Sequence, residues 1–457
     1  MGISRRKFLA LAGGMLAGPQ LVLAETSDDG FQVIRATAQT AQFLEAGGTT
    51  NVWGYGEKGQ PAVLTAKQGF EAKFRFINEL DQEIWLHWFG VRGPSEVMTL
   101  NVPSGEAQAV DCVFTPPDAG TFWLGPVARI SQSRAMGLYG LFVVEEASKL
   151  PGLADLPLVI SDWKIADDGA MDAGFGDIST AVGEGRMGNW FTVNGRYRPQ
   201  LDLAKDAFTR LRVLNAANAR VMQLQFKGDD PLVVALDGQP LAPPQQLDAA
   251  GLILQPGQRA DLLAQGVGGG VTLALKVFED LVEVATLQAA SAKPPELAEN
   301  FTLPPNPLAT GFDAATAQLV ELVLEGGEKG GLTGATLNGE AKDLRALLEA
   351  GFGWAINGVA GPGGTPLGPF GKGLPVLLAV DNRTAIDQPL HIHGHVWQMT
   401  EANGVALESA PWRDTAVIPA KGQARLLFVA DNPGAWAIQS LIAERADSGF
   451  AIGFEVA

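Results

Sequence analysis

The sequence has few of the residues that cross-link a chain or carry it across a membrane. Only one cysteine, Cys112, occurs among the 457 residues, which excludes an intramolecular disulfide. Cys112 lies in the alternating run 109–114, where we expect a small, buried, apolar residue. No apolar run reaches the ~20 residues that a membrane-spanning helix needs, so we expect no stable membrane anchor.

Positive charge is also scarce. The chain has 33 Lys and Arg residues against 50 Asp and Glu residues, which gives a formal net charge of -17 at pH 7. A surface of this sign repels the phosphate backbone of nucleic acids and the headgroups of anionic lipids. We therefore expect no nucleic-acid partner.

Turn-forming residues, in contrast, are abundant. The 56 glycines and 28 prolines divide the sequence into many short apolar runs, separated by pairs such as Asp-Gly, Asn-Gly and Pro-Gly. Such a pattern is typical of short β strands joined by tight turns. The chain is too long for one hydrophobic core and suits about three domains of roughly 150 residues. The predicted fold class is all-β, with three consecutive Greek-key β-sandwich domains.

The N-terminus has the pattern of an export signal. Arg5 and Arg6 precede a weak apolar segment, and small residues lead up to Ala24. This arrangement resembles a bacterial twin-arginine signal peptide. We predict that residues 1–24 are removed during export and that the mature protein is periplasmic.

Strand-like runs follow in three blocks. They predict a first sandwich domain over residues 25–148, a second over 149–292, a Pro-rich linker over 293–312 and a third sandwich over 313–457. Within the third block, leucines at helical spacing predict one short helix over 342–349.

Two late segments contain the residues that suggest chemistry. The first, 388–399, holds His391, His393 and His395, and the second runs over 432–445. Alternate residues of a β strand share one face. The spacing therefore predicts that these three histidines point the same way, as the ligands of a metal site do.

Together, the two segments resemble the last two copper-binding motifs of the multicopper oxidases, His-Pro-x-His-x-His and His-Cys-His-x-x-x-His. Runs in the second block, such as 156–163 and 190–195, are similar to the middle domain of that family. The resemblance covers essentially the whole chain after residue 24 and implies three cupredoxin-like domains. It also implies two kinds of site in an active member: a blue copper centre and a three-copper cluster between the first and third domains.

Most of the ligand positions that the resemblance implies have lost their ligands. Histidine remains at His87, His391 and His393. The blue-copper positions hold Gln388, Ser440 and Arg445, with Phe450 at the axial position, and the other cluster positions hold Phe89, Gly125, Val127, Gln439 and Leu441. The resemblance therefore implies neither a blue centre nor oxygen reduction. His395 is not a ligand in the family, and we expect it to serve in packing.

We expect a non-catalytic scaffold or binding protein that acts in cell division or envelope stress. Some division-associated, copper-free members of the family combine the same signal, the same three domains and missing ligands. A periplasmic protein would then be the partner, with the division machinery as one candidate, and no catalytic residue or cofactor would be needed. The alternative is a copper-binding protein, or a residual oxidase, with one copper ion at His87, His391 and His393.

Overall fold

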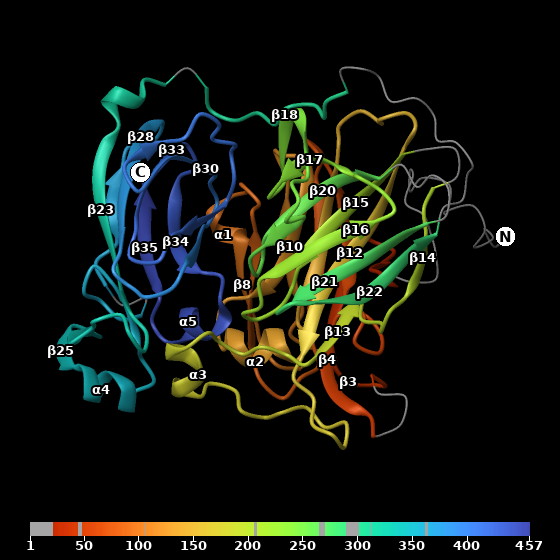
Figure 1. Cartoon of the computed structure of the whole chain (residues 1–457), viewed down its shortest axis with the longest axis horizontal. Coiled ribbons are helices and arrows are strands. Elements are labelled where there is room, and N and C mark those ends of the chain that lie inside the picture. The colour runs from red at the N-terminus through yellow and green to blue at the C-terminus, as the bar shows by residue number, and fades with distance from the viewer. Residues whose placement is uncertain are drawn as a thin grey trace.

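The computed structural model describes residues 22–43, 48–105, 107–204, 208–264, 270–288, 301–310, 312–361 and 364–457. This part of the chain is mainly β structure, arranged as layered sheets with a few short helices (Figure 1), so the all-β prediction is confirmed. The predicted signal segment up to residue 21 lies outside the described residues, and so does the start of the predicted linker, up to residue 300.

The first two sheets contain strands from residues 22–145. One sheet has the order β1-β5-β11-β10-β7-β8, and the other has the order β2-β3-β6-β9, with β4 paired to β3. Sheet neighbours such as β5 and β11 are far apart in sequence, as in a Greek key. The elements are β1 (Val22–Leu23), β2 (Glu25–Thr26), β3 (Gln32–Ala41), β4 (Thr50–Gly54), β5 (Ala62–Lys67), β6 (Ala72–Asn78), β7 (Ile84–Phe89), α1 (Ser95–Met98), β8 (Thr99–Val102), β9 (Val110–Phe114), β10 (Gly120–Pro126), α2 (Ile130–Ala135) and β11 (Gly140–Glu145).

The second pair of sheets contains strands from residues 153–288. Their orders are β13-β12-β15-β20-β17-β18 and β14-β22-β21-β16-β19. The elements are β12 (Leu153–Trp163), α3 (Ile178–Val182), β13 (Trp190–Val193), β14 (Gln200–Asp202), β15 (Phe208–Asn215), β16 (Met222–Lys227), β17 (Leu232–Leu236), β18 (Gln239–Gln246), β19 (Leu252–Leu254), β20 (Arg259–Ala264), β21 (Val271–Val277) and β22 (Asp280–Gln288).

The third pair has the orders β26-β23-β28-β33-β30-β31 and β27-β35-β34-β29-β32, and a small β24-β25 hairpin accompanies it. The elements are η1 (Ala314–Thr316), β23 (Gln318–Gly326), β24 (Gly334–Leu337), β25 (Glu340–Asp343), α4 (Leu344–Glu349), β26 (Trp354–Ile356), β27 (Leu367–Phe370), β28 (Leu374–Asn382), β29 (Gln388–Ile392), β30 (Trp397–Ala402), β31 (Val405–Ala406), β32 (Thr415–Ile418), β33 (Gln423–Ala430), β34 (Gly434–Ser440), α5 (Ala443–Asp447) and β35 (Ala451–Val456).

The short helix predicted in the third block is present as α4. Asp343 precedes it, and the side-chain oxygen of this residue accepts the backbone N–H of Ala346 at 2.8 Å, which caps the helix. Leu347, on the apolar side of the helix, is fully buried. The residue numbers at which the three domains begin and end stay a prediction.

Two clusters of buried side chains cross from one sandwich to another. The larger joins the cores of the first and third sandwiches and includes Trp88 and Trp397. The smaller contains residues of all three sandwiches, among them Phe89, Trp163 and Leu441. Because burying a large apolar side chain contributes about 1.5–3 kcal/mol, these clusters fix the three sandwiches against one another.

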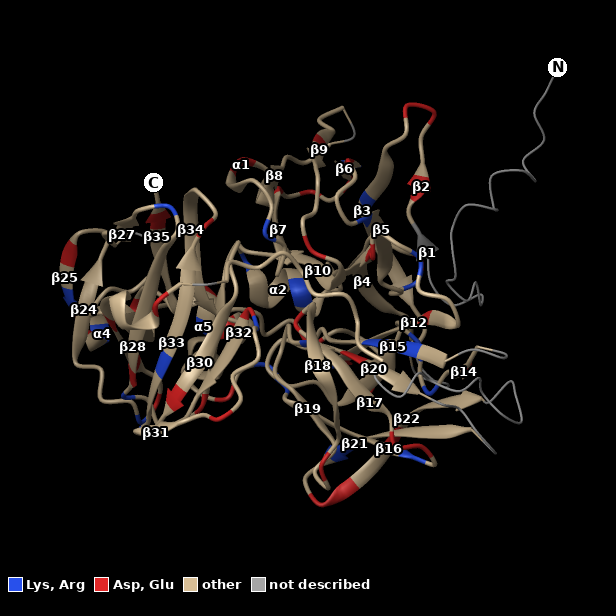
Figure 2. Ribbon diagram, turned by 90° about the horizontal axis from the view of Figure 1, so that it is seen from above, with Lys and Arg blue, Asp and Glu red and all other residues tan. Residues whose placement is uncertain are grey.

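In the part of the chain that the structure describes, basic residues do not gather on one surface. In Figure 2, Lys and Arg residues are scattered singly among Asp and Glu residues. Within the described ranges, the helices are all too short or too polar to cross a bilayer.

The single cysteine is buried on β9, as the sequence predicts. The Cys112 sulfur lies 3.5 Å from the carbonyl oxygen of Val97. Burial raises the pKa of the thiol to about 12, so Cys112 is a neutral packing residue at ordinary pH.

A buried charge network joins the first and second sandwiches. Arg212 donates to Asp155 at 3.1 Å and to the hydroxyl of Thr121 at 2.8 Å, while Arg210 pairs with both Asp155 and Glu146. Burial raises the pKa of Asp155, but the two guanidinium groups outweigh this effect and the pKa falls to about 2. The carboxylate therefore stays ionised down to strongly acidic pH.

We expect Asp155→Asn to lower the free energy of unfolding at pH 7 by about 3 kcal/mol, because two buried guanidinium groups lose their shared carboxylate. The folded-state pKa lies below the unfolded value of about 3.9. The contribution is therefore present above about pH 4 and is lost as the pH falls through about 2. Urea titrations at several pH values should show the difference between wild type and variant shrinking over this range. Glu340→Gln, at an exposed carboxylate, is the control, and a difference that stays constant with pH would contradict the prediction.

Candidate metal centre

The four segments that correspond to the copper motifs meet between the first and third sandwiches. In the first sandwich, β7 carries His87 and Phe89, and its pairing with β10 places His87 opposite Gly125. In the third sandwich, β29 carries His391, and its pairing with β34 places His391 opposite Gln439. The backbone thus retains a four-segment site even where the side chains differ.

The structure brings His87, His391 and His393 together, although they come from two sandwiches. All three are buried, with at most 5% of the residue exposed. The rings of His87 and His393 stack with their centroids 3.8 Å apart. One ring nitrogen from each residue lies within 4.8 Å of those from the other two. The three residues predicted as possible metal ligands therefore form one cluster.

Polar partners hold two of the three rings in place. Nδ1 of His87 lies 2.9 Å from the hydroxyl of Thr99, and Nδ1 of His391 lies 3.2 Å from Asp414 Oδ1 and 3.2 Å from the hydroxyl of Thr415. The Nε2 atom of each clustered histidine is buried without a hydrogen-bond partner. A ring held through one nitrogen, with the other left free, is the usual state of a metal-binding histidine.

Burial also sets the charge of these rings. It lowers the pKa of His87 and of His393 well below the ordinary value, and the neighbouring His391 lowers both further. Both imidazoles are therefore neutral at pH 7. Neutral imidazole is the form that can donate a lone pair to a metal ion.

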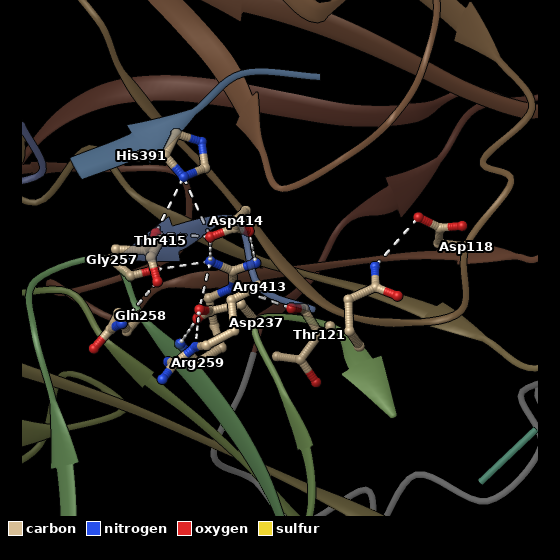
Figure 3. A network of polar contacts seen from close by, with 12 residues as sticks. Asp118, Thr121, Asp237, Gly257, Gln258, Arg259, His391, Arg413, Asp414 and Thr415 are labelled. Atoms are coloured by element: carbon tan, nitrogen blue, oxygen red, sulfur yellow. Dashed lines mark hydrogen bonds and ion pairs between the residues drawn. The ribbon is translucent and has the colours of Figure 1, made fainter. Parts of the chain in front are cut away.

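The partner of His391 belongs to a buried network that reaches the second sandwich (Figure 3). Asp414 accepts a hydrogen bond from Arg259 Nη1 at 3.1 Å, and Arg259 also donates to the backbone oxygen of Thr121 in the first sandwich at 3.1 Å. Nearby, Arg413 Nε donates to the carboxylate of Asp237 at 2.7 Å. Burial raises the pKa of Asp414, but Arg259 outweighs it and keeps the carboxylate ionised. Asp414 thus fixes the orientation of His391.

Apart from Gln439, which is polar and buried, the other cluster positions lie in apolar packing. The ring of Phe89 stacks on Trp123 with centroids 4.1 Å apart and planes 11° apart. Leu441 is fully buried in the same cluster, and Val127 packs against it. At Gly125, an added β-carbon would lie 2.1 Å from the Trp123 ring. The space that an imidazole at residue 125 would need is therefore taken by Trp123.

The blue-copper positions contain an arginine bound to an amide. Arg445 Nη1 donates to Gln388 Oε1 at 2.9 Å, and its guanidinium lies over the ring of Trp354 at 5.2 Å. Ser440 accepts the backbone N–H of Ile442 at 3.2 Å. Burial lowers the pKa of Arg445 to about 10, so this residue remains a cation at pH 7.

These contacts decide which metal groups the residues can hold. A blue copper needs two imidazoles and a thiolate, and a cation at Arg445 with a hydroxyl at Ser440 does not fit it. The three-copper cluster does not fit either, because its other ligand positions hold Phe89, Gly125, Val127, Gln439 and Leu441, none of which offers an imidazole. A single ion held by three imidazoles does fit the free Nε2 atoms, and it would supply Lewis acidity there.

The prediction that His395 shares a face with the other two histidines is wrong. The strand β29 ends at Ile392, and a turn with Gly394 at φ +65° follows, so the alternation stops. His395 instead packs among the rings of Trp436 and Phe454, with centroids 5.7 and 5.3 Å away. It serves in packing, as the sequence comparison implied.

Some residues at the site were not found from the sequence. Arg134 donates to the backbone oxygen of Leu441 at 2.8 Å and lies 5.0 Å over the Trp123 ring, which ties the first sandwich to the third. Nothing in the spacing of Arg134 indicates this contact. Asp414, in the Trp-Arg-Asp-Thr run at 412–415, is the second such residue, because its contact with His391 can be found only in the structure.

The fold and the site together define a three-domain cupredoxin protein whose centre lies between its first and third domains. Two family models described as multicopper oxidase match the chain, one over residues 37–149 and the other over residues 342–457. The crystal structure of a multicopper oxidase from Pseudomonas thermotolerans superposes with a TM-score of 0.80 at 27% identity, covering 96% of this chain and 100% of that one. The chain belongs to the multicopper oxidase superfamily, and the cupredoxin fold is confirmed.

Similar curated proteins include both oxidases and division proteins. Multicopper oxidase MmcO of Mycobacterium tuberculosis is 25% identical over 93% of this chain and 87% of its own length. Cell division protein FtsP of Escherichia coli is 26% identical over 59% of this chain and 61% of its own length, and FtsP of Haemophilus influenzae is 26% identical over 51% and 50%. The chain thus resembles FtsP, and these alignments span about half to three fifths of the FtsP proteins.

We expect Phe89→Ala to lower the free energy of unfolding by about 3–5 kcal/mol, because it empties the space beside Trp123. His87→Ala should cost less, since it also removes a buried nitrogen that lacks a partner. Denaturant unfolding of both variants would measure the difference. Phe70→Ala, at a phenyl ring that is 56% exposed, is the control and should have little effect. A larger loss for His87→Ala than for Phe89→Ala would contradict this account.

Proposed function

We propose that this protein is a non-catalytic, exported binding protein that uses the multicopper oxidase fold as a rigid scaffold. The observation that carries the proposal is the hydrogen bond between Arg445 and Gln388, at 2.9 Å, in the place of the blue copper. A buried cation repels a copper ion, and neither side chain is a copper ligand.

The loss of this centre removes the first step of the oxidase reaction. In a multicopper oxidase the blue copper takes electrons from the substrate and passes them to the cluster, where oxygen is reduced. Here Phe89, Leu441 and Trp123 occupy the cluster side as a packed apolar group. On this proposal, neither the blue-copper positions nor the cluster positions hold a metal ion that could accept electrons from a substrate.

The similarity to FtsP supports a role in the bacterial envelope during cell division. On this proposal the protein acts by binding another periplasmic protein, and the three fixed sandwiches present its surface. The strongly acidic balance of the chain, with a formal net charge of -17, favours a partner that carries positive charge at the contact.

We expect protein produced with ample copper to be colourless and to consume no oxygen with phenolic or aromatic amine substrates, because Ser440 supplies no thiolate for a blue centre. Visible absorption, copper content by mass spectrometry and oxygen uptake would measure this. Phe89→His should remain inactive too, since Gly125, Val127 and Leu441 still leave the cluster incomplete. Copper-dependent turnover by the wild-type protein would refute the proposed function.

A second candidate function is the binding of one copper ion without oxidase activity. Three free Nε2 atoms within reach of one another favour it. An ion that binds only the folded state would raise stability by about 2.7 kcal/mol at a concentration 100-fold above its Kd. Thermal unfolding with copper and then with excess EDTA tests this possibility. We expect no change in Tm. A rise with copper that His391→Ala abolishes would establish the second candidate instead.

We expect export to depend on Arg5 and Arg6, which resemble the pair of a twin-arginine signal. Replacing both with lysine should keep the precursor in the cytoplasm, because that pathway recognises the guanidinium pair. Cell fractionation and immunoblotting would follow the precursor and the mature form. Replacing Lys7 with arginine is the control and should leave export intact. Normal amounts of mature periplasmic protein after the double substitution would contradict the predicted route.

A further inference from the structure

The outer face of one sheet in the second sandwich carries exposed apolar side chains. This sheet has the order β14-β22-β21-β16-β19, and its inner face packs on the core of the second sandwich. In Figure 2, β16, β21 and β22 lie along one outer side of the molecule, away from α5. The exposed residues are Val221 (41%), Ile253 (50%), Phe278 (91%) and Leu281 (40%).

Strand register places two of these residues, Ile253 and Leu281, in one row on the outer face, with Gln223 and Lys276 between them. Ile253 on β19 is paired with Gln223 on β16, and Lys276 on β21 is paired with Leu281 on β22. The pairing of β16 with β21 makes Gln223 and Lys276 level with each other. Because paired residues share a face, Ile253 and Leu281 lie in one row across four strands.

The other two residues lie just beyond the ends of these strands. Val221 directly precedes β16 and Phe278 directly follows β21, and because the two neighbouring strands are antiparallel, both residues lie at the same end of the sheet. The four apolar residues therefore form one patch, which we call the hairpin face. Exposed apolar groups that are adjacent in this way usually mark a contact surface.

The backbone at Phe278 gives an independent indication of function. Val277 pairs with Asp280, so Phe278 is the first of two turn residues, and its φ is +53°. Hairpin turn positions with positive φ normally hold glycine, asparagine or aspartate, because a bulky side chain there is strained. The β30–β31 hairpin of the same chain follows the rule with Asn403 and Gly404 at its turn. A bulky, exposed ring kept in a strained position is typical of a functional site.

The charges around the hairpin face indicate the kind of partner. Glu279, Asp280 and Glu283 are exposed beside the patch, against Lys276 and Arg198, whose Nε donates to the backbone oxygen of Glu283 at 3.0 Å. The acidic groups still outnumber the basic ones. The whole chain also carries a formal net charge of -17, so a second copy would be repelled. An anionic membrane would be repelled for the same reason. A protein surface with lysine or arginine around apolar side chains complements the face.

We propose that the hairpin face is a docking surface for a protein partner that presents apolar side chains flanked by basic residues. This inference rests on the proposed function, in which the chain acts by binding another protein. It deepens that function by assigning the contact to the second sandwich. The surface is separate from the histidine cluster, so it operates whether or not a metal ion binds there.

The test uses two synthetic peptides of about 12 residues as probes, one alternating leucine with lysine and the other alternating serine with lysine. Fluorescence anisotropy at physiological salt measures their binding to the full mature chain. We expect the leucine peptide to bind and Phe278→Gly to weaken that binding at least about tenfold. Val405→Ser, at a 66% exposed valine on β31, is the matched control and should change the affinity less than about twofold.

Phe278→Gly separates loss of binding from loss of folding. Glycine adopts positive φ without strain, so the variant should melt at the wild-type temperature or above it. A second variant, Leu281→Ser, keeps the turn unchanged and should also weaken the leucine peptide. A drop in affinity without a drop in Tm would then assign the contact to the exposed side chains.

Three results would overturn the proposal. The serine peptide binding as tightly as the leucine peptide would show that charge alone acts. Self-association that Phe278→Gly abolishes would make the face a contact between copies. Binding to phosphatidylcholine vesicles that the same substitution abolishes would make it a membrane contact. Failure of the proposed function is distinct, because it appears as copper-dependent oxygen uptake, whatever the peptides do.

Discussion

The arrangement of the three sandwiches depends on the short helix α5, which contacts all of them. Its last residue, Asp447, accepts the backbone N–H groups of Ile130 and Ser131 at 2.9 and 2.7 Å and so caps α2 in the first sandwich. Glu444 accepts a hydrogen bond from Asn218 of the second sandwich at 2.8 Å. These bonds are buried, where electrostatic interactions are stronger than in water. One helical turn therefore sets the relative position of three domains.

The same junction shows which contacts connect the segments that correspond to the copper motifs. In the superfamily the segment before this helix supplies ligands to both copper sites. Here Arg445 binds Gln388 inside the third sandwich, and Arg134 binds the Leu441 carbonyl across the border with the first. The rings of Phe89 and Trp123 stack in the same buried cluster as Leu441. Hydrogen bonds and apolar contacts thus connect these segments.

The sequence predicts the features that depend on local pattern. Strand-like runs, turn pairs and a helix over 342–349 follow from spacing and turn chemistry, and the residues at the ligand positions follow from alignment to short motifs. In the structure the helix begins two residues later, because Asp343 ends β25 and caps it. The position of the His395 side chain could not be predicted, because alternation along a strand does not show where the strand ends. The roles of Asp414 and Arg134 depend on contacts between residues more than 20 apart in sequence. Such contacts leave no periodic signal.

The packing around Trp123 also limits which side chains residue 125 can accept. A β-carbon at residue 125 would lie 2.1 Å from the Trp123 ring, so histidine cannot be introduced there while the ring keeps its place. Shrinking Trp123 first would leave Phe89 without its stacking partner and would open a cavity in the cluster that joins the sandwiches. A histidine at residue 125 therefore requires a destabilising change in the packing before any copper can bind. Selection for a stable fold opposes that first change.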